Sequence, residues 1–168
     1  SWGRSYKGQY TSYCRKYDFL LRNVYQDLLF IVSAGNTGRA GKSSIQDPAD
    51  CKNPMAVGST LSYGSDLRQG ELGHEYLADY SSRGPAQDGR MKPDIVGPGH
   101  FVLTANAVPN KVGECDGDYE PDVKLNRAGG KGVKYTTGTS MASPALAGGA
   151  AIIRQYFEER YCNTEVCC

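Results

Sequence analysis

The sequence contains no long hydrophobic run, no excess of one charge and only two histidines. Its longest apolar stretches, residues 28–32 and 145–153, are far too short to span a bilayer. With 19 basic and 18 acidic residues, the net charge is +1, so the chain lacks the excess of positive charge that is typical of nucleic-acid-binding proteins. We therefore expect no membrane-spanning segment and no nucleic acid as a partner.

Cysteine pairs with the spacing of metal ligands are also absent. The six cysteines are Cys14, Cys51, Cys115, Cys162, Cys167 and Cys168. None forms a CxxC pair, so their spacing predicts no zinc site. Their even number favours disulfides in an oxidising compartment, which implies secretion or the lumen of the secretory pathway. A set of free buried thiols remains the alternative.

The chain has enough material for one folded domain. It contains 168 residues, of which 39% are hydrophobic, and this is sufficient to bury a core. Its 21 glycines and 8 prolines indicate many turns, as in a loop-rich α/β enzyme rather than a helical bundle.

Hydrophobic spacing predicts alternating helices and strands. Residues 13–27 carry apolar side chains at helical intervals, and residues 28–32 form an apolar run typical of a buried parallel strand. A second helix, rich in alanine and glycine, is expected at residues 140–156. Shorter strands are expected at residues 53–61, 94–96, 101–103 and 133–136. This alternation favours an α/β architecture with a parallel sheet.

Two polar positions stand where such a sheet places its chemistry. Residues 33–36 follow the first strand at its carboxyl end, the edge at which ligands bind in open α/β sheets. Ser140 opens the second helix, where the helix dipole favours developing negative charge. Taken alone, Ser140 is equally explained as an N-cap and Asn36 as a left-handed turn residue before Gly38.

The wider pattern gives these residues a specific context. The run Gly-Thr-Ser-Met-Ala-Ser-Pro at residues 138–144 resembles the nucleophile motif of subtilisin-like serine proteases. Residues 33–36 resemble the oxyanion-hole segment of that family, and residues 81–85 and 88–99 its connecting blocks. Residues 1–3 resemble the end of the strand that lines its substrate groove. The resemblance covers nearly the whole chain and is strongest to the large branch with a C-terminal β-domain.

This resemblance implies a serine endopeptidase that acts on polypeptides through an acyl-enzyme. Ser140 would be the nucleophile, and the Asn36 side-chain amide would stabilise the oxyanion together with the Ser140 backbone N–H. By the same resemblance, Ser33, Ala34 and Gly35 form one wall of the first specificity pocket and thus bind substrate.

The general base and its orienting acid have no counterpart in the sequence. His74 lies in a polar loop and His100 enters a strand, and neither position matches the family's base. We therefore expect residues 1–168 to be the C-terminal portion of a subtilisin-like catalytic domain, an incomplete three-layer α/β fold. The N-terminal half, covalent or as a partner chain, would supply Asp and His, and the fragment alone would be inactive. A protease-derived structural or binding domain without catalysis stays open.

Three other patterns in the sequence match known functional sites only in part. Residues 35–43 approach a phosphate-binding loop, but the spacing is one residue too long and no helix follows. An α/β-hydrolase would need its histidine after Ser140, where the sequence has none. The acidic run Asp116, Asp118, Glu120 and Asp122 makes calcium possible, although it lacks the glycine and glutamate of an EF-hand. We therefore predict no cofactor other than possible calcium.

Two expectations concern burial. The helix at residues 140–156 should lie buried in the centre of the fold, because its Ala, Gly and Ile face is almost wholly apolar. The strand at residues 28–32 should present an edge and an apolar face that another segment covers.

Overall fold

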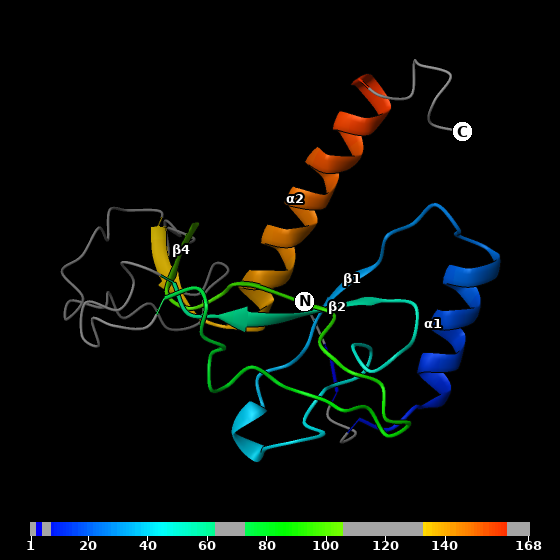
Figure 1. The fold of residues 1–168 in the computed structure, drawn as a ribbon, viewed down its shortest axis with the longest axis horizontal. Coiled ribbons are helices and arrows are strands. Elements are labelled where there is room, and N and C mark those ends of the chain that lie inside the picture. Colours follow the sequence, from blue (N-terminus) through cyan, green and yellow to red (C-terminus); the bar gives the residue numbers. More distant parts are fainter. Residues whose placement is uncertain (1–2, 5–7, 63–72, 106–132, 161–168) are drawn as a thin grey trace, which may run out of the picture.

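The computed structural model describes residues 3–4, 8–62, 73–105 and 133–160 (Figure 1). In chain order its elements are α1 (Ser12–Asn23), β1 (Ile31–Ser33), the short 3-10 helix η1 (Gly38–Ala40), β2 (Met55–Thr60), β3 (Ile95–Pro98), β4 (Val102–Ala105), β5 (Val133–Thr136) and α2 (Thr139–Arg160). Every predicted helix and strand corresponds to one of these elements; β5 has the predicted ends, and the ends of the others are shifted.

The central feature is a parallel sheet with the strand order β1-β2-β3. Val32 pairs with Ala56 between β1 and β2, and Gly58 pairs with Val96 between β2 and β3. Strands β4 and β5 form a separate antiparallel pair that leads into α2. The α/β fold class with a parallel sheet is therefore confirmed.

Helix α1 begins and ends where its sequence favours it. Thr11 caps the helix by accepting from the amide of Cys14 at 3.3 Å. The helix ends at Asn23, earlier than predicted, because the amides of Val24 and Tyr25 both donate to the carbonyl of Leu20. A disulfide between Cys14 and Cys51 ties α1 to the loop that precedes β2.

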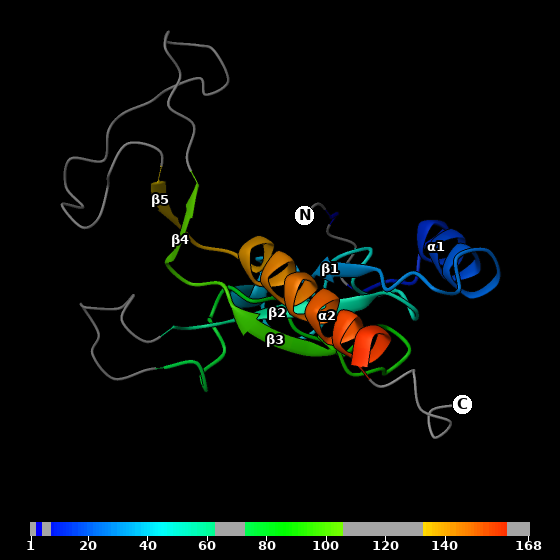
Figure 2. The same cartoon turned by 90° about the horizontal axis from the view of Figure 1, so that it is seen from above.

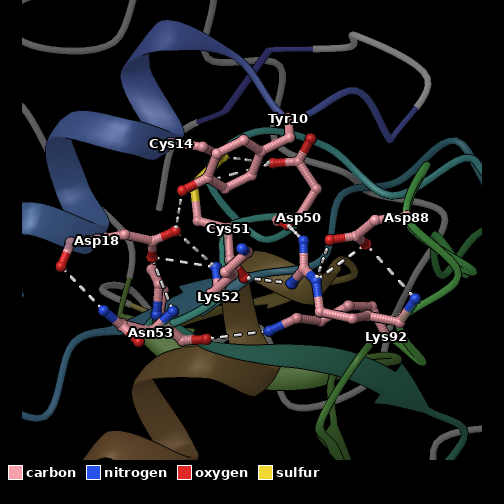
Figure 3. Close-up of polar contacts among 11 residues, drawn as sticks. Tyr10, Cys14, Asp18, Asp50, Cys51, Lys52, Asn53, Asp88 and Lys92 are labelled. Atoms are coloured by element: carbon pink, nitrogen blue, oxygen red, sulfur yellow. Dashed lines mark hydrogen bonds and ion pairs between the residues drawn. A yellow bond between two sulfur atoms is a disulfide. The ribbon is translucent and has the colours of Figure 1, made fainter.

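Asp18 makes a second connection between α1 and that loop. Its carboxylate accepts from the backbone amides of Lys52 at 3.0 Å and Asn53 at 2.8 Å, and from the hydroxyl of Tyr10 at 2.6 Å. Figure 3 shows Tyr10, Asp18 and Asn53 gathered at this point. Asp18 thus holds the middle of α1 against the loop that precedes β2.

The first strand is shorter than predicted. Leu28 and Leu29 lie outside β1 and are about half exposed, whereas Val32 and Ser33 are buried. Pairing with β2 determines where β1 begins, because the register starts with Ile31 opposite Met55. Val32 then joins a small core with Ala34, Ile45, Ala49 and Ala56.

Helix α2 packs across all three parallel strands, and Figure 2 shows it crossing β2 and β3. Close packing against β3 depends on Gly97, where a Cβ would come 3.0 Å from the side chain of Leu146. In the first turns of the helix, Thr139, Ala142 and Ser143 are buried.

The prediction that the helix at residues 140–156 lies buried in the centre of the fold is wrong for most of its residues. Beyond Ser143 most positions are exposed, and Ile152 and Ile153 reach 69% and 60% exposure. The physical reason is that the sheet meets only the first part of the helix, while the rest projects past it (Figure 1). Despite its apolar residues, no helix in the described ranges has the length and hydropathy of a membrane span.

Candidate active site

The turn between β5 and α2 places Ser140 in the first turn of a helix. Gly138 has φ +154°, and its amide donates to the carbonyl of Gly99 at 2.8 Å. A Cβ on Gly99 would lie 2.6 Å from the carbonyl oxygen of Gly138, so only glycine allows this approach. Ser140 follows, half-buried, at the positive end of the α2 dipole.

Asn36 reaches the same turn from the carboxyl end of β1. Its Oδ1 accepts from both the backbone amide and the hydroxyl of Thr139, each at 2.9 Å. These bonds fix Oδ1 as the acceptor end of the amide and leave Nδ2 as the donor end. Among the described residues, the non-glycine positions with positive φ are Ser43 and Phe101, so Asn36 is not a left-handed turn residue.

Thr139 is the residue of this site that the sequence did not single out. It is fully buried, and its hydroxyl also accepts from the amide of Gly35 at 3.3 Å. Thr139 lies 103 residues from Asn36 along the chain, so no local pattern could show that the two meet. Its place directly before Ser140 in the nucleophile motif was the available signal.

The predicted specificity wall lies at the end of β1. Ser33 and Ala34 are buried, and Gly35 adopts φ +105° with the side chain of Gln46 packed against it. The Ala34 amide donates to the carbonyl of Val57, which continues the sheet beyond the strand. This segment is therefore held rigidly, and its contact with substrate stays a prediction.

Residues 80–82, where the first predicted connecting block begins, hold the loop that carries Asn36. Ser82 accepts from the amide of Thr37 at 3.0 Å, and Tyr80 accepts from that of Gly38 at 2.8 Å. A Cβ on Gly38 would come 2.1 Å from the carbonyl oxygen of Ser81, so the loop packs directly on this backbone. The residues around Asn36 are thus tied to a rigid frame.

Asp94 has a structural role within the predicted connecting block at residues 88–99. Its Oδ2 accepts from the ammonium of Lys92 at 2.6 Å and from the amide of Ala56 at 2.7 Å. The Lys92 side chain is almost completely buried and donates also to the carbonyl of Pro54 at 3.1 Å. This ion pair fixes the start of β3 against β2 rather than serving the active site.

The two histidines lie in surroundings typical of structural or surface residues. His74 is exposed and lies 3.8 Å from the carboxylate of Glu75. The ring of His100 stacks on Tyr80 and meets Phe101 edge to face, with centroids 5.9 Å and 4.7 Å apart. His100 lies in the bend between β3 and β4 and not in a strand, and its aromatic packing does not identify a catalytic base.

One further cluster, which contains two acidic residues, lies around the Cys14–Cys51 disulfide. Asp47 and Asp50 are buried there beside Cys14 and Cys51, as a group that could hold a metal ion. Burial, followed by the repulsion of the Asp47 carboxylate, raises the pKa of Asp50 to about 6. The acidic run at residues 116–122 and the other four cysteines lie outside the described residues, so calcium binding stays a prediction.

The chain resembles known proteins over nearly its whole length. The model of the subtilase family (Peptidase S8) matches residues 1–166. The serine protease AprX of Bacillus subtilis (strain 168) is 32% identical over 130 residues, which cover 76% of this chain and 26% of AprX. The minor extracellular protease Vpr of the same organism is 36% identical over 136 residues, 79% of this chain and 15% of Vpr.

Among solved structures, sphericase superposes with a TM-score of 0.59 at 23% identity. The superposition covers 96% of this chain and 42% of sphericase, and it supports the same fold. The chain therefore spans less than half the length of each of these three proteins.

Proposed function

Because the chain belongs to the subtilase family, we propose that it is the C-terminal portion of the catalytic domain of a serine endopeptidase. Membership of this family implies a serine protease and, with it, a polypeptide substrate. The observation that carries the proposal is the pair of bonds from Thr139 to Asn36, which places an oriented amide beside the nucleophile turn.

The proposed reaction uses Ser140 and Asn36 in two steps. The hydroxyl of Ser140 attacks the scissile carbonyl while its proton passes to a histidine. The tetrahedral oxyanion then accepts hydrogen bonds from Asn36 Nδ2 and from the Ser140 amide, helped by the positive end of α2. Collapse releases the amine product and leaves an acyl-enzyme, which water hydrolyses. Ser33, Ala34 and Gly35 would contact the substrate side chain on one side.

The histidine and aspartate of this reaction would come from a segment outside these 168 residues. His74 and His100 both lie outside the family's motif for the base, and neither has the surroundings of one. The greater length of the relatives leaves room for such a segment, in the same protein or in a partner chain. We expect the 168 residues alone to be inactive.

We also propose that the protein is secreted or resides in the secretory pathway. The Cys14–Cys51 disulfide supports this, because disulfides persist in oxidising compartments. The relative Vpr is named as an extracellular protease, which agrees with the same location.

A fluorophosphonate probe tests the catalytic proposal directly, because it labels a serine only when a base and an oxyanion hole surround it. The full-length protein should be labelled at Ser140, whereas its Ser140→Ala variant and the 168-residue chain should not react. Absence of labelling in the folded full-length protein would instead support a structural or binding domain derived from a protease.

Replacement of Asn36 by leucine tests the oxyanion role. In subtilisin, loss of one oxyanion donor lowers kcat by ~100- to 1000-fold, and we expect the same order in Asn36→Leu. KM should change little, because the oxyanion forms only on the way to the transition state. Steady-state kinetics on a peptide substrate separates the two constants, and equal losses in kcat and substrate affinity would contradict the role.

A further inference from the structure

Four side chains of metal-binding type meet where α1 is joined to the loop before β2. Cys14 comes from α1, and Asp47, Asp50 and Cys51 come from the loop. One ligand atom from each residue lies within 4.8 Å of the others, and all four residues are buried. Figure 3 shows the carboxylate of Asp50 beside the disulfide. The group is independent of Ser140 and Asn36.

Asp50 provides a second observation that points to a cationic ligand. The residue is completely buried, and its Oδ2 has no hydrogen-bond partner in the described part of the chain. Its Oδ1 lies 3.1 Å from the sulfur of Cys14 and 4.0 Å from that of Cys51. Disulfide sulfurs carry no proton, so they offer this carboxylate no donor. A buried carboxylate oxygen without a partner is costly, which makes this atom unusual.

The donor set favours one class of metal. Two thiolates with two carboxylates suit Zn²⁺, which prefers four ligands that include sulfur, whereas calcium requires oxygen donors. A tetrahedral zinc ion would place these donors about 3.3 to 3.8 Å apart, so the observed cluster needs only small shifts once the sulfurs separate.

Arg90 and Thr11 make further contacts with the residues of this cluster. The guanidinium of Arg90 donates to the backbone carbonyls of Asp50 at 2.7 Å and of Cys51 at 3.1 Å. These bonds also hold the loop in place. Asp47 accepts from the hydroxyl of Thr11, the residue that caps α1. Both chain segments that carry the ligands are therefore anchored by contacts other than the disulfide.

We propose that Cys14, Cys51, Asp47 and Asp50 bind a zinc-class divalent ion when the Cys14–Cys51 disulfide is reduced. A dithiol reductant breaks the S–S bond by transferring two electrons and two protons, and is itself oxidised to a disulfide. Metal binding then releases the two thiol protons to solvent. The disulfide and the metal are alternative cross-links between α1 and the loop before β2, and each excludes the other.

The test uses Co²⁺ as the probe, because thiolate coordination in a tetrahedral site gives it visible absorption. Any free thiol would also coordinate Co²⁺, so the full-length protein is studied with Cys115, Cys162, Cys167 and Cys168 replaced by serine. After reduction this protein should bind one Co²⁺ per chain, and Zn²⁺ should displace it. The oxidised protein should bind none at this site.

Variants separate the four-ligand site from adventitious binding to thiols. Asp50→Asn and Asp47→Asn should each weaken Co²⁺ binding at least ~10-fold, the lower limit for loss of even an outer-shell partner. Cys14→Ser should abolish the thiolate absorption. Asp79→Asn, which alters an exposed acid paired with Arg39, is the matched control and should leave binding unchanged.

Circular dichroism on the same samples shows whether the reduced protein is still folded. Metal should restore or raise the thermal stability of the reduced protein and leave that of the oxidised protein unchanged. The proposal is overturned if the reduced protein binds no Co²⁺, whether folded or not. It is equally overturned if Asp50→Asn and Asp47→Asn bind Co²⁺ as tightly as the parent protein.

Discussion

Thr139 acts on Asn36 through two hydrogen bonds, and at the scale of single residues this contact is the main positioning feature of the site. Thr139→Val removes the hydroxyl and keeps the shape and the backbone amide. A net hydrogen bond contributes about 0.5 to 1.5 kcal/mol, so we expect kcat to fall by ~3- to 10-fold with KM nearly unchanged. Steady-state kinetics of the complete enzyme measures both constants.

Thr139→Ser is the control for this substitution, because serine keeps the donor. It should retain most of the wild-type kcat. If Thr139→Val and Thr139→Ser lower activity equally, or if both act mainly through reduced stability, Thr139 has only a packing role.

The buried Lys92 is expected to matter for stability and not for catalysis. Lys92→Met keeps the aliphatic stem but leaves Asp94 and the carbonyl of Pro54 without the ammonium donor. Leaving such groups unsatisfied costs about 1 to 3 kcal/mol, and we expect the free energy of unfolding in denaturant to fall by this amount. Arg39→Met, at an exposed ion pair, should leave it nearly unchanged. A similar loss in both variants would show that burial is not the cause.

At the scale of elements, the attachment of α1 to the loop before β2 has a pH signature. Burial, together with the hydrogen bond to Asp18, raises the pKa of Tyr10 from 10.0 to about 12. The folded protein therefore keeps this proton at pH values where the unfolded chain loses it. The resulting stability is fully present below pH 10 and is lost as the pH rises from 10 to about 12.

Tyr10→Phe should flatten this part of the pH dependence, because it removes the titrating group. The pKa values of Tyr17 and Tyr80 are raised as well, so the informative quantity is the difference between wild type and variant. Unfolding in denaturant at several pH values between 9 and 12 measures it. Parallel curves for the two proteins would mean that Tyr10 does not contribute.

The elements themselves followed from the sequence because their signals are local. Apolar spacing predicted α1, and the apolar run before Ser33 predicted β1. The ends of these two elements did not follow from the sequence. Helix α1 ends at Asn23 because the next two amides both donate to the carbonyl of Leu20, and the pairing of Ile31 with Met55 sets the start of β1. Motif resemblance identified Asn36 and Ser140, and the structure brings Asn36 to the turn that carries Ser140.

Contacts between distant segments did not follow from the sequence. Cys14 and Cys51 are separated by 37 positions, so their spacing resembles no metal motif even though two aspartates join them in space. The bond between Thr139 and Asn36 likewise spans most of the chain. The exposure of α2 was mispredicted for a related reason, because an apolar sequence shows that a face needs a partner but not where the partner is.

At the scale of the whole molecule, several large apolar side chains are exposed on α2 and on the residues before β1. Arg154 of α2 donates to the carbonyl of Asp27 at 3.0 Å, so the outer half of the helix lies next to the residues before β1. Ile152 and Tyr156 lie on a face of α2 that is turned away from Arg154, since residues two apart on a helix do not face the same side, and both are exposed, as are Leu28 and Leu29. Soluble proteins rarely leave so much apolar surface open, which supports the proposal that another segment of the protease packs against it.

Gly148 allows this packing to be tested. Ala145, Gly148, Ile152 and Tyr156 share one face of α2, because they follow each other at intervals of three and four residues. Among the described residues, a Cβ on Gly148 would meet nothing within 4 Å, so without further contacts Gly148→Ala should stabilise the helix by about 0.5 to 1 kcal/mol. In the full-length protein, a segment packed on this face would instead clash with the added methyl group and cost about 1 to 3 kcal/mol. Unfolding of the full-length protein and its Gly148→Ala variant decides by the sign of the change. Destabilisation shows that the face is covered, and stabilisation would contradict the proposed N-terminal partner.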